Sequence, residues 1–198
     1  MDNEPTMKPH APPGVGLSEP EEAALLQRVA ARDRHAFERL YRVYWPRLTR
    51  FLDKITRRPD LVEELLNDTM LTVWHRADSF RAESRVSTWV LGIAYKKALK
   101  ALRSARAHDA LESGGDETPS EDTPESALTH TQLRGQLTRA LASLPPAQRA
   151  VVELTYYHGY GYSEIATIVG CPVDTVKTRM FHARRKLRLL LEALTEEG

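Results

Sequence analysis

The chain has one cysteine, Cys171, among its 198 residues, so an intramolecular disulfide framework and a clustered cysteine metal site are both excluded. No apolar run approaches the ~20 residues of a membrane-spanning helix, and the first residues do not have the pattern of a signal peptide. The sequence contains no glycine-rich phosphate loop, no His-Glu-x-x-His or Cys-x-x-Cys metal spacing and no nucleophile elbow. Its seven histidines are scattered from His10 to His182. We therefore expect a cytoplasmic protein that has no catalytic residue, metal ion or cofactor.

The charged residues are segregated along the chain, although they nearly cancel to a net charge of +1. The segment 108–127 contains seven acidic residues and no lysine or arginine, together with two glycines and two prolines. Such a segment is too polar to pack, and the stretches on either side of it are basic. The sequence thus predicts a disordered proline-rich tail (1–21), a helical domain (22–106), a flexible acidic linker (107–131) and a second helical domain (132–196).

Apolar residues recur at the three- and four-residue spacing of amphipathic helices, and no strand-like alternation persists. We therefore predict an all-α fold of two small domains. Pro46 should bend or interrupt a helix, and the hydroxyls of Ser87 and Thr88 should cap another. The first helix is expected to begin near Glu21 or Glu22, and others to cover 34–44, 47–55, 60–74, 87 to about 106, 128–144 and 147–157.

The stretch 161–190 has the pattern of two helices joined by a tight turn. Ser163 is a candidate N-cap, Gly170 can adopt the left-handed conformation that ends a helix, and Pro172 suits the first turn of the next one. An apolar stripe follows, made of Val176, Met180, Ala183, Leu187 and Leu190. The other faces carry Lys177, Arg179, His182, Arg184, Arg185, Lys186 and Arg188. This pattern is typical of a helix in the DNA major groove, although a solvated basic helix is an alternative.

Phe181 lies off that apolar stripe, so its ring is expected to be exposed. A contact with a thymine methyl group would explain an exposed aromatic ring on a basic helix face. This residue favours DNA binding over the alternative of a solvated surface helix.

The order and spacing of these segments resemble the bacterial sigma factors of the extracytoplasmic-function (ECF) type, within the sigma-70 family, in their minimal two-domain form. Residues 36–106, with AFERLYRVYWPRL, LVEELLNDTMLTVW and SFRAESRVSTWVLGIA, are similar to sigma region 2. Residues 132–194, with LPPAQRAVVELTYYHGYGYSEIATIVGCPVDTVKTRMFHARRKL, are similar to region 4. The resemblance implies a subunit that binds core RNA polymerase, recognises a −35 duplex and a melted −10 strand of promoter DNA, and is controlled by an anti-sigma factor.

The resemblance assigns two surfaces to the first domain. Four polar residues would face the beta-prime clamp helices of the polymerase: Glu63, Glu64, Asn67 and Asp68. The loop that captures a flipped −10 base would include Phe80, Arg81, Glu83 and Ser84. The next helix would hold the melted strand with Trp89, Lys96, Lys97, Lys100 and Arg103. A solvated helix face and an ordinary helix connection are the alternatives for the first two sets.

Two lysines of this domain depart from the family pattern. Many relatives have Asn and Asp where this chain has Lys96 and Lys100, so charges replace base-reading groups. The −10 preference of those relatives therefore does not carry over to this chain. Attraction to the DNA phosphates should increase instead.

The second domain is expected to bind the −35 element and the polymerase beta flap. The resemblance assigns the −35 contacts to Lys177, Thr178, Arg179, Phe181, His182, Arg184 and Arg185. His182 replaces an arginine of many relatives, which should weaken the reading of guanine because only Arg offers a bidentate fork. Asp174 stands where relatives often have Gly, and an acid is favourable in a first helical turn.

Two alternatives remain open from the sequence alone. The acidic linker either follows the family's path through the polymerase cleft or serves as a loose tether. The chain could also be a free-standing helix-turn-helix regulator, which would bind a palindromic duplex tightly without polymerase.

Overall fold

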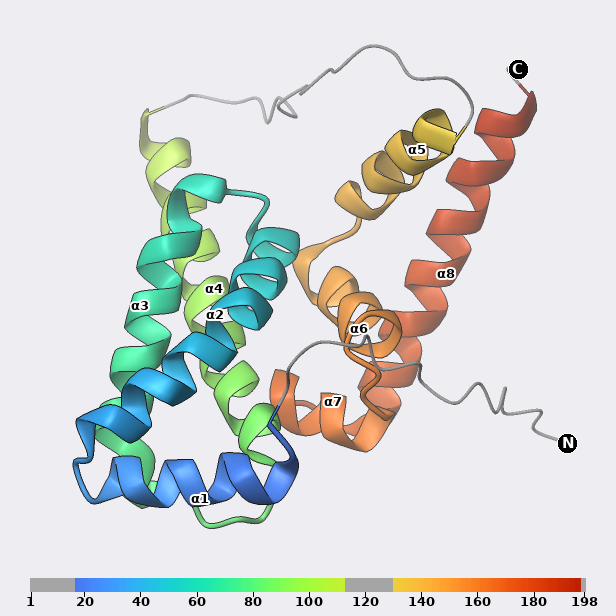
Figure 1. Cartoon of the computed structure of the whole chain (residues 1–198). Helices are drawn as coiled ribbons and strands as arrows, with labels where there is room; N and C mark the ends of the chain where they lie inside the picture. Colours follow the sequence, from blue (N-terminus) through green and yellow to red (C-terminus); the bar gives the residue numbers. More distant parts are fainter. Residues whose placement is uncertain (1–16, 113–129, 197–198) are drawn as a thin grey trace, which may run out of the picture.

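A computed structural model describes residues 17–112 and 130–196, and within these ranges the chain is all-α, as predicted. The helices form two groups, α1 to α4 and α5 to α8, which Figure 1 shows side by side. The first group comprises α1 (Glu19–Ala30), α2 (Arg34–Thr56), α3 (Pro59–Arg76), a 3-10 turn, η1 (Ala77–Ser79), and α4 (Val86–Glu112). The second comprises α5 (His130–Ala142), α6 (Pro146–Tyr156), α7 (Tyr162–Val169) and α8 (Val173–Glu196).

The core of the first group is made by the apolar faces of its helices. Leu40, Phe51 and Leu66 are completely buried there, as large side chains at helical spacing require. One carboxylate lies in the same interior: Glu22 accepts hydrogen bonds from the Tyr44 hydroxyl (2.8 Å) and from the Arg47 guanidinium (2.7 Å). These partners compensate for the cost of burying the charge and tie α1 to α2.

Pro46 does not interrupt α2, which runs without a break from Arg34 to Thr56, so the prediction of two separate segments was wrong. A proline removes one backbone hydrogen bond from a helix interior. Buried side chains on both sides of it, Tyr44 and Leu48, pack into the same core. This tertiary packing outweighs the local preference, as it commonly does for amphipathic helices.

The limits of α4 also differ from the expected ones. The helix begins at Val86, so Ser87 and Thr88 lie in its first turn instead of capping it, and the buried Thr88 hydroxyl has no hydrogen-bond partner. At its other end α4 continues past Arg106 to Glu112. The helical ends at 112 and 130 fall inside the segment predicted as the acidic linker, while its central part, 113–129, and the tail residues 1–16 lie outside the described residues.

The helix-turn-helix of the second group forms where the sequence predicted it, with different caps. Gly161 occupies the N-cap of α7, and its N–H donates to the Glu164 carboxylate (3.1 Å), so Ser163 is not the cap. Gly170 ends α7 in the left-handed conformation (φ 67°), as predicted. Pro172 precedes α8 rather than lying in its first turn, and its carbonyl accepts the N–H of Thr175 (3.0 Å).

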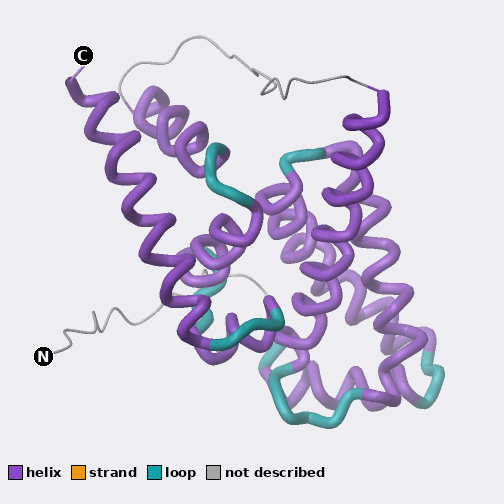
Figure 2. Tube along the Cα trace, turned by 180° about the vertical axis from the view of Figure 1, so that it is seen from behind, coloured by secondary structure: helices purple, strands orange, loops and turns teal. Residues whose placement is uncertain are grey.

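The two groups pack against each other along two pairs of helices. The helix α7 lies against α4, and α6 lies against the end of α2. Seen from behind in Figure 2, the described part of the chain consists of helices joined by short loops. Among the described helices, none is long and apolar enough to cross a membrane.

Candidate nucleic-acid and polymerase interfaces

The outward face of α8 gathers most of the residues predicted to bind −35 DNA. Lys177, Thr178, Phe181, His182 and Arg185 are all exposed. The Phe181 ring is 63% exposed, as predicted, and meets the His182 imidazole edge-on with 5.5 Å between the ring centroids. An exposed aromatic pair next to cationic groups can contact base edges and phosphates at the same time.

Several of these side chains are held in place by partners within their own domain. The Lys177 ammonium lies 3.3 Å from the Asp174 carboxylate, and the Thr178 hydroxyl donates to the Asp174 carbonyl (2.9 Å). The Arg184 guanidinium donates to the Tyr156 hydroxyl (3.1 Å) and lies over that ring at 5.9 Å. These contacts orient the polar surface of α8 before any ligand arrives.

Arg179 is the exception among the predicted −35 residues because it turns away from the outward face. Its guanidinium donates to the Cys171 sulfur (3.5 Å) and lies near the phenol of Tyr95, which belongs to α4 of the other group. Burial raises the pKa of the Tyr95 phenol, and the neighbouring Arg179 opposes that rise. The structure therefore does not bring Arg179 together with the other predicted −35 residues.

The residues predicted to bind the −10 strand line one side of α4 and the loop before it. Lys96, Lys100 and Arg103 are exposed on this side, one helical turn apart. At the start of the helix, the half-buried rings of Phe80 and Trp89 lie 5.5 Å apart at an interplanar angle of 57°. The basic row thus begins at an aromatic pair that offers a surface for base stacking.

The loop itself carries its polar groups towards solvent. Arg81 and Glu83 are exposed, and Ser84 is half-buried. Between them, Ala82 has a positive φ of 56°, which is a strained conformation for a residue with a Cβ. Strain of this kind persists only where the surroundings impose it, and it is common at binding loops.

The predicted polymerase-binding residues share one face of α3. Glu63, Glu64, Asn67 and Asp68 are all exposed, with Leu71 beside them at 53% exposure. The Tyr41 hydroxyl donates to the Asn67 side-chain oxygen (2.7 Å), which fixes this amide on the surface.

One ion pair joins the α3 face to α4. The Lys97 ammonium lies 3.3 Å from the Asp68 carboxylate. Lys97 therefore lies on the α3 side of α4, apart from the row formed by Lys96, Lys100 and Arg103.

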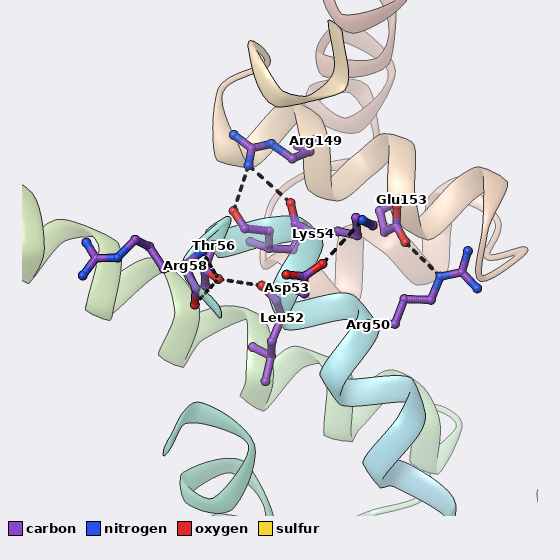
Figure 3. A network of polar contacts seen from close by, with 9 residues as sticks. Arg50, Leu52, Asp53, Lys54, Thr56, Arg58, Arg149 and Glu153 are labelled. Atoms are coloured by element: carbon purple, nitrogen blue, oxygen red, sulfur yellow. Dashed lines mark hydrogen bonds and ion pairs between the residues drawn. The ribbon is translucent and has the colours of Figure 1, made fainter. Parts of the chain in front are cut away.

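Sequence reasoning missed a polar network at the contact between α6 and α2, which Figure 3 shows. Buried Arg149 donates to the carbonyls of Lys54 (3.3 Å) and Ile55 (3.4 Å) near the end of α2. It also donates to those of Ala142 (3.3 Å), the last residue of α5, and Leu144 (2.8 Å) just beyond it. Burial lowers the pKa of Arg149 to about 10. An arginine within the apolar run of α6 was the available signal, but its partners lie far away in sequence.

Two further titratable groups are buried near this network. Burial raises the pKa of Glu153 to about 7, although the Arg50 guanidinium, 3.9 Å away, opposes the rise. Burial lowers the pKa of His158 to about 4, and its ring meets Phe51 of α2 edge-on at 5.8 Å. Among the described residues, no three His, Cys, Asp or Glu side chains come together as metal ligands.

Comparisons with known proteins found family matches in both helical groups of the chain. The Sigma-70 region 2 family matches residues 40–108, and the Sigma-70 region 4 family matches residues 134–187. The ECF RNA polymerase sigma factor SigM of Mycobacterium tuberculosis (strain ATCC 25618 / H37Rv) is 34% identical over 184 residues, which cover 90% of each chain. The chain belongs to the ECF RNA polymerase sigma factors. The resemblance inferred from the sequence is thereby confirmed.

Two further sigma factors give the same result. The ECF RNA polymerase sigma factor RpoE of Cereibacter sphaeroides is 32% identical over 160 residues, or 79% of this chain and 87% of that protein. The solved structure of the sigma factor RpoE in complex with the anti-sigma factor NepR from Bartonella quintana is 27% identical, with a TM-score of 0.65, over 79% of this chain and 96% of that one. As a sigma factor, the protein is a DNA-binding transcription initiation factor.

Proposed function

We propose that this ECF sigma factor binds core RNA polymerase through α3, holds the melted −10 strand on α4 and its preceding loop, and reads the −35 duplex with α8. The observation that carries the proposal is the separation of charge on the surface. An acidic and amide face on α3 and basic faces on α4 and α8 belong to different helices of one chain. In this proposal the protein catalyses no reaction itself and acts in the cytoplasm.

The α3 face suits the positively charged side chains of a polymerase clamp. Glu63, Glu64 and Asp68 present carboxylates, and exposed Leu71 adds an apolar contact beside them. Interfaces commonly combine an apolar centre with a charged rim that steers association. The beta-prime clamp helices are the partner proposed for this face, and the beta flap is the one proposed for the second domain.

The loop before α4 suits the capture of one unstacked base. A flipped base must regain the lost stacking energy, and the Phe80–Trp89 pair offers aromatic surface for it. Arg81, Glu83 and Ser84 supply polar groups for the base edge. Lys96, Lys100 and Arg103 then follow the phosphates of the same strand.

The outward face of α8 suits the major groove of the −35 element. Lys177, Thr178, Phe181 and His182 are placed to approach base edges, and Arg184 and Arg185 to approach phosphates. The RpoE protein of Bartonella quintana was solved with an anti-sigma factor. We propose that an anti-sigma factor likewise controls this chain by covering the same surfaces.

In vitro transcription on a pooled promoter library tests the proposal. The protein is mixed with a purified bacterial core RNA polymerase, and the transcripts are sequenced to find shared −35 and −10 elements. We expect start sites that depend on the protein, and we expect Glu64→Arg/Asp68→Arg to abolish both core binding and transcription. Arg42→Ala, an exposed change on α2, is the control. A protein that ignores core polymerase but shifts a palindromic duplex would instead be a free-standing regulator.

A further inference from the structure

Asp174 places a carboxylate at the start of the helix that is proposed to read the −35 duplex. It is the second residue of α8, which begins at Val173. The backbone around it is fixed, because the Pro172 carbonyl accepts the N–H groups of Thr175 (3.0 Å) and Val176 (3.2 Å). The side chain itself is 92% exposed. Asp174 therefore combines a well-defined backbone position with a carboxylate that faces solvent.

Asp174 lies on the outward face of α8, in line with residues that are proposed to contact DNA. Spacings of four, three and four residues place the members of this line one above another on the helix: Asp174, Thr178, Phe181 and Arg185. All four are exposed, and the buried residues Val176, Met180 and Ala183 lie on the opposite face. The N-terminal residues of a recognition helix are the ones that contact base edges. Under the proposed function, the Asp174 carboxylate would therefore meet the floor of the major groove.

A carboxylate in this place lowers the affinity for some base pairs and not for others. An ionised carboxylate has acceptor oxygens only. A base edge that presents a carbonyl oxygen to it therefore leaves both groups without a hydrogen-bond partner after their water is displaced. The helix dipole also favours an acid in a first turn, but that effect acts on the folding of α8 and is the same for every DNA sequence. The penalty on carbonyl oxygens depends on the sequence.

The cation next to Asp174 makes the two side chains complementary to one kind of base pair. The Lys177 ammonium lies 3.3 Å from the Asp174 carboxylate, so a charged donor and a charged acceptor lie side by side. A G·C pair offers the matching pattern in the major groove, because O6 and N7 of guanine accept and the N4 amino group of cytosine donates. Exposed ion pairs contribute little to stability, so both groups can exchange each other for the base pair at little cost.

Resting on the proposed function, we infer that Asp174 determines specificity at one position of the −35 element by requiring an exocyclic amino group there. That group is N4 of cytosine or N6 of adenine, and it donates a hydrogen bond to the Asp174 carboxylate. Where the base is cytosine, Lys177 donates to the guanine of the same pair. The carbonyl oxygens of thymine and guanine are rejected at this position. Specificity thus comes from repulsion of the wrong bases as well as from attraction to the right ones.

Selection of promoter duplexes by holoenzyme tests the rejection of carbonyl oxygens. The full-length protein and core polymerase are mixed with duplexes randomised across the −35 element, and the bound molecules are sequenced. For the wild type, we expect one position at which cytosine or adenine is preferred about tenfold over thymine and guanine, as for one hydrogen bond to a charged group. Asp174→Asn keeps the shape and one acceptor oxygen but adds an amide donor that carbonyl oxygens can accept. The preference should fall to about twofold at that position alone.

Asp60→Asn is the matched control for charge and for the helix dipole. Asp60 is likewise an aspartate in the first turn of a helix, α3, and its carboxylate lies 2.9 Å from the Arg58 guanidinium. The net charge of the chain changes by the same amount in both variants. We expect holoenzyme with Asp60→Asn to select the same −35 motif as the wild type.

Base analogues identify the amino group that Asp174 contacts. In a labelled promoter duplex, the preferred base is replaced by 2-pyrimidinone if it is cytosine, or by purine if it is adenine, since each analogue lacks only the exocyclic amino group. We expect the analogue to weaken binding of wild-type holoenzyme about tenfold, measured by anisotropy. Asp174→Ala has no carboxylate, so its binding should not depend on the amino group. Weaker base pairing by the analogue affects both proteins and cancels in the double-mutant comparison.

Two results would overturn the inference. If wild type and Asp174→Asn select the same motif, or if Asp174→Asn gains affinity equally for all bases, the carboxylate does no more than repel phosphates. If the analogue weakens wild type and Asp174→Ala equally, another residue contacts the amino group. A holoenzyme that enriches no −35 motif at all would contradict the proposed function instead, which distinguishes that failure from a motif that does not depend on Asp174.

Discussion

The two basic helices of this sigma factor present their charges in different ways. On α4, Lys96 and Lys100 are exposed and have no hydrogen-bond or ion-pair partner among the described residues. On α8, Lys177 and Arg184 are each held by a neighbouring side chain. An unrestrained lysine attracts phosphate without selecting its geometry, whereas an oriented side chain can select a base edge. Under the proposed function, we therefore expect an electrostatic, sequence-tolerant role for α4 and a geometric role for α8.

The largest expected effect comes from removing the unrestrained charges. Lys96→Ala/Lys100→Ala should lower transcription from a cognate promoter at least about tenfold. For single-strand binding, the slope of log K against log salt concentration should become smaller by about 1.4, since each phosphate contact contributes about 0.7 to that slope. The measurement is anisotropy of a labelled −10 strand bound to holoenzyme over a range of salt concentrations. Replacing two exposed arginines of α2, Arg39 and Arg42, is the control. An unchanged slope would mean that α4 does not hold phosphates.

The next effect tests whether the contact of α6 with α2 contributes to the stability of the fold that holds α8 in place. The pKa of Glu153 is raised to about 7 by burial, with Arg50 and Lys54 lowering it and Asp53 raising it. Because the raised pKa means that the folded chain binds this proton more tightly, the group stabilises the fold fully below about pH 4.5 and loses that contribution as the pH rises to about 7.

Glu153→Gln should therefore be more stable than the wild type at pH 8, by about 1–2 kcal/mol, and equally stable near pH 4.5. Thermal unfolding at a series of pH values measures the difference. The lowered pKa of His158 acts in the opposite direction but is present in both proteins, so it cancels. Glu64→Gln, an exposed change, should show no such trend, and a similar trend there would contradict the assignment to Glu153.

A smaller effect is expected from removing the Tyr156 hydroxyl, which accepts a hydrogen bond from Arg184 of α8. Tyr156→Phe removes the acceptor of the Arg184 hydrogen bond and keeps the ring over which the guanidinium lies. Binding of a cognate −35 duplex should weaken about fivefold, which corresponds to a hydrogen bond of about 1 kcal/mol. Tyr157→Phe is the matched control because Tyr157 stacks on Arg50 instead. If both variants bind alike, orientation of Arg184 is not important for reading DNA.

The smallest effect concerns the loop before α4. Ala82→Gly relieves the positive φ and should stabilise the protein by less than about 1 kcal/mol, because glycine also gains entropy in the unfolded state. Arg57→Gly, at another positive φ, should give a similar gain in thermal unfolding. Only Ala82→Gly should also weaken capture of a −10 strand by holoenzyme. Equal strand binding by the two variants would remove any role of the strained loop.

Much of the fold could be predicted from local sequence patterns, whereas contacts between residues far apart in the sequence could not. The exposed face of α3 and the apolar stripe of α8 follow from helical spacing, so they could be predicted. The continuity of α2 through Pro46 depends on a core formed by other helices. Arg179 belongs to the basic pattern of α8, but its side chain lies near Cys171 and near Tyr95 of α4, which the sequence pattern does not show. Arg149 was missed for the same reason.

The ion pair between Asp68 and Lys97 has a consequence for the order of assembly under the proposed function. In that proposal the carboxylate belongs to the face that binds polymerase and the ammonium to the helix that binds the −10 strand, and the two lie 3.3 Å apart. A clamp side chain that takes Asp68 releases Lys97 to a phosphate, so each ligand favours the binding of the other. Such coupling is reciprocal by thermodynamic necessity. The factor by which polymerase improves the affinity for the strand must equal the factor by which the strand improves the affinity for polymerase.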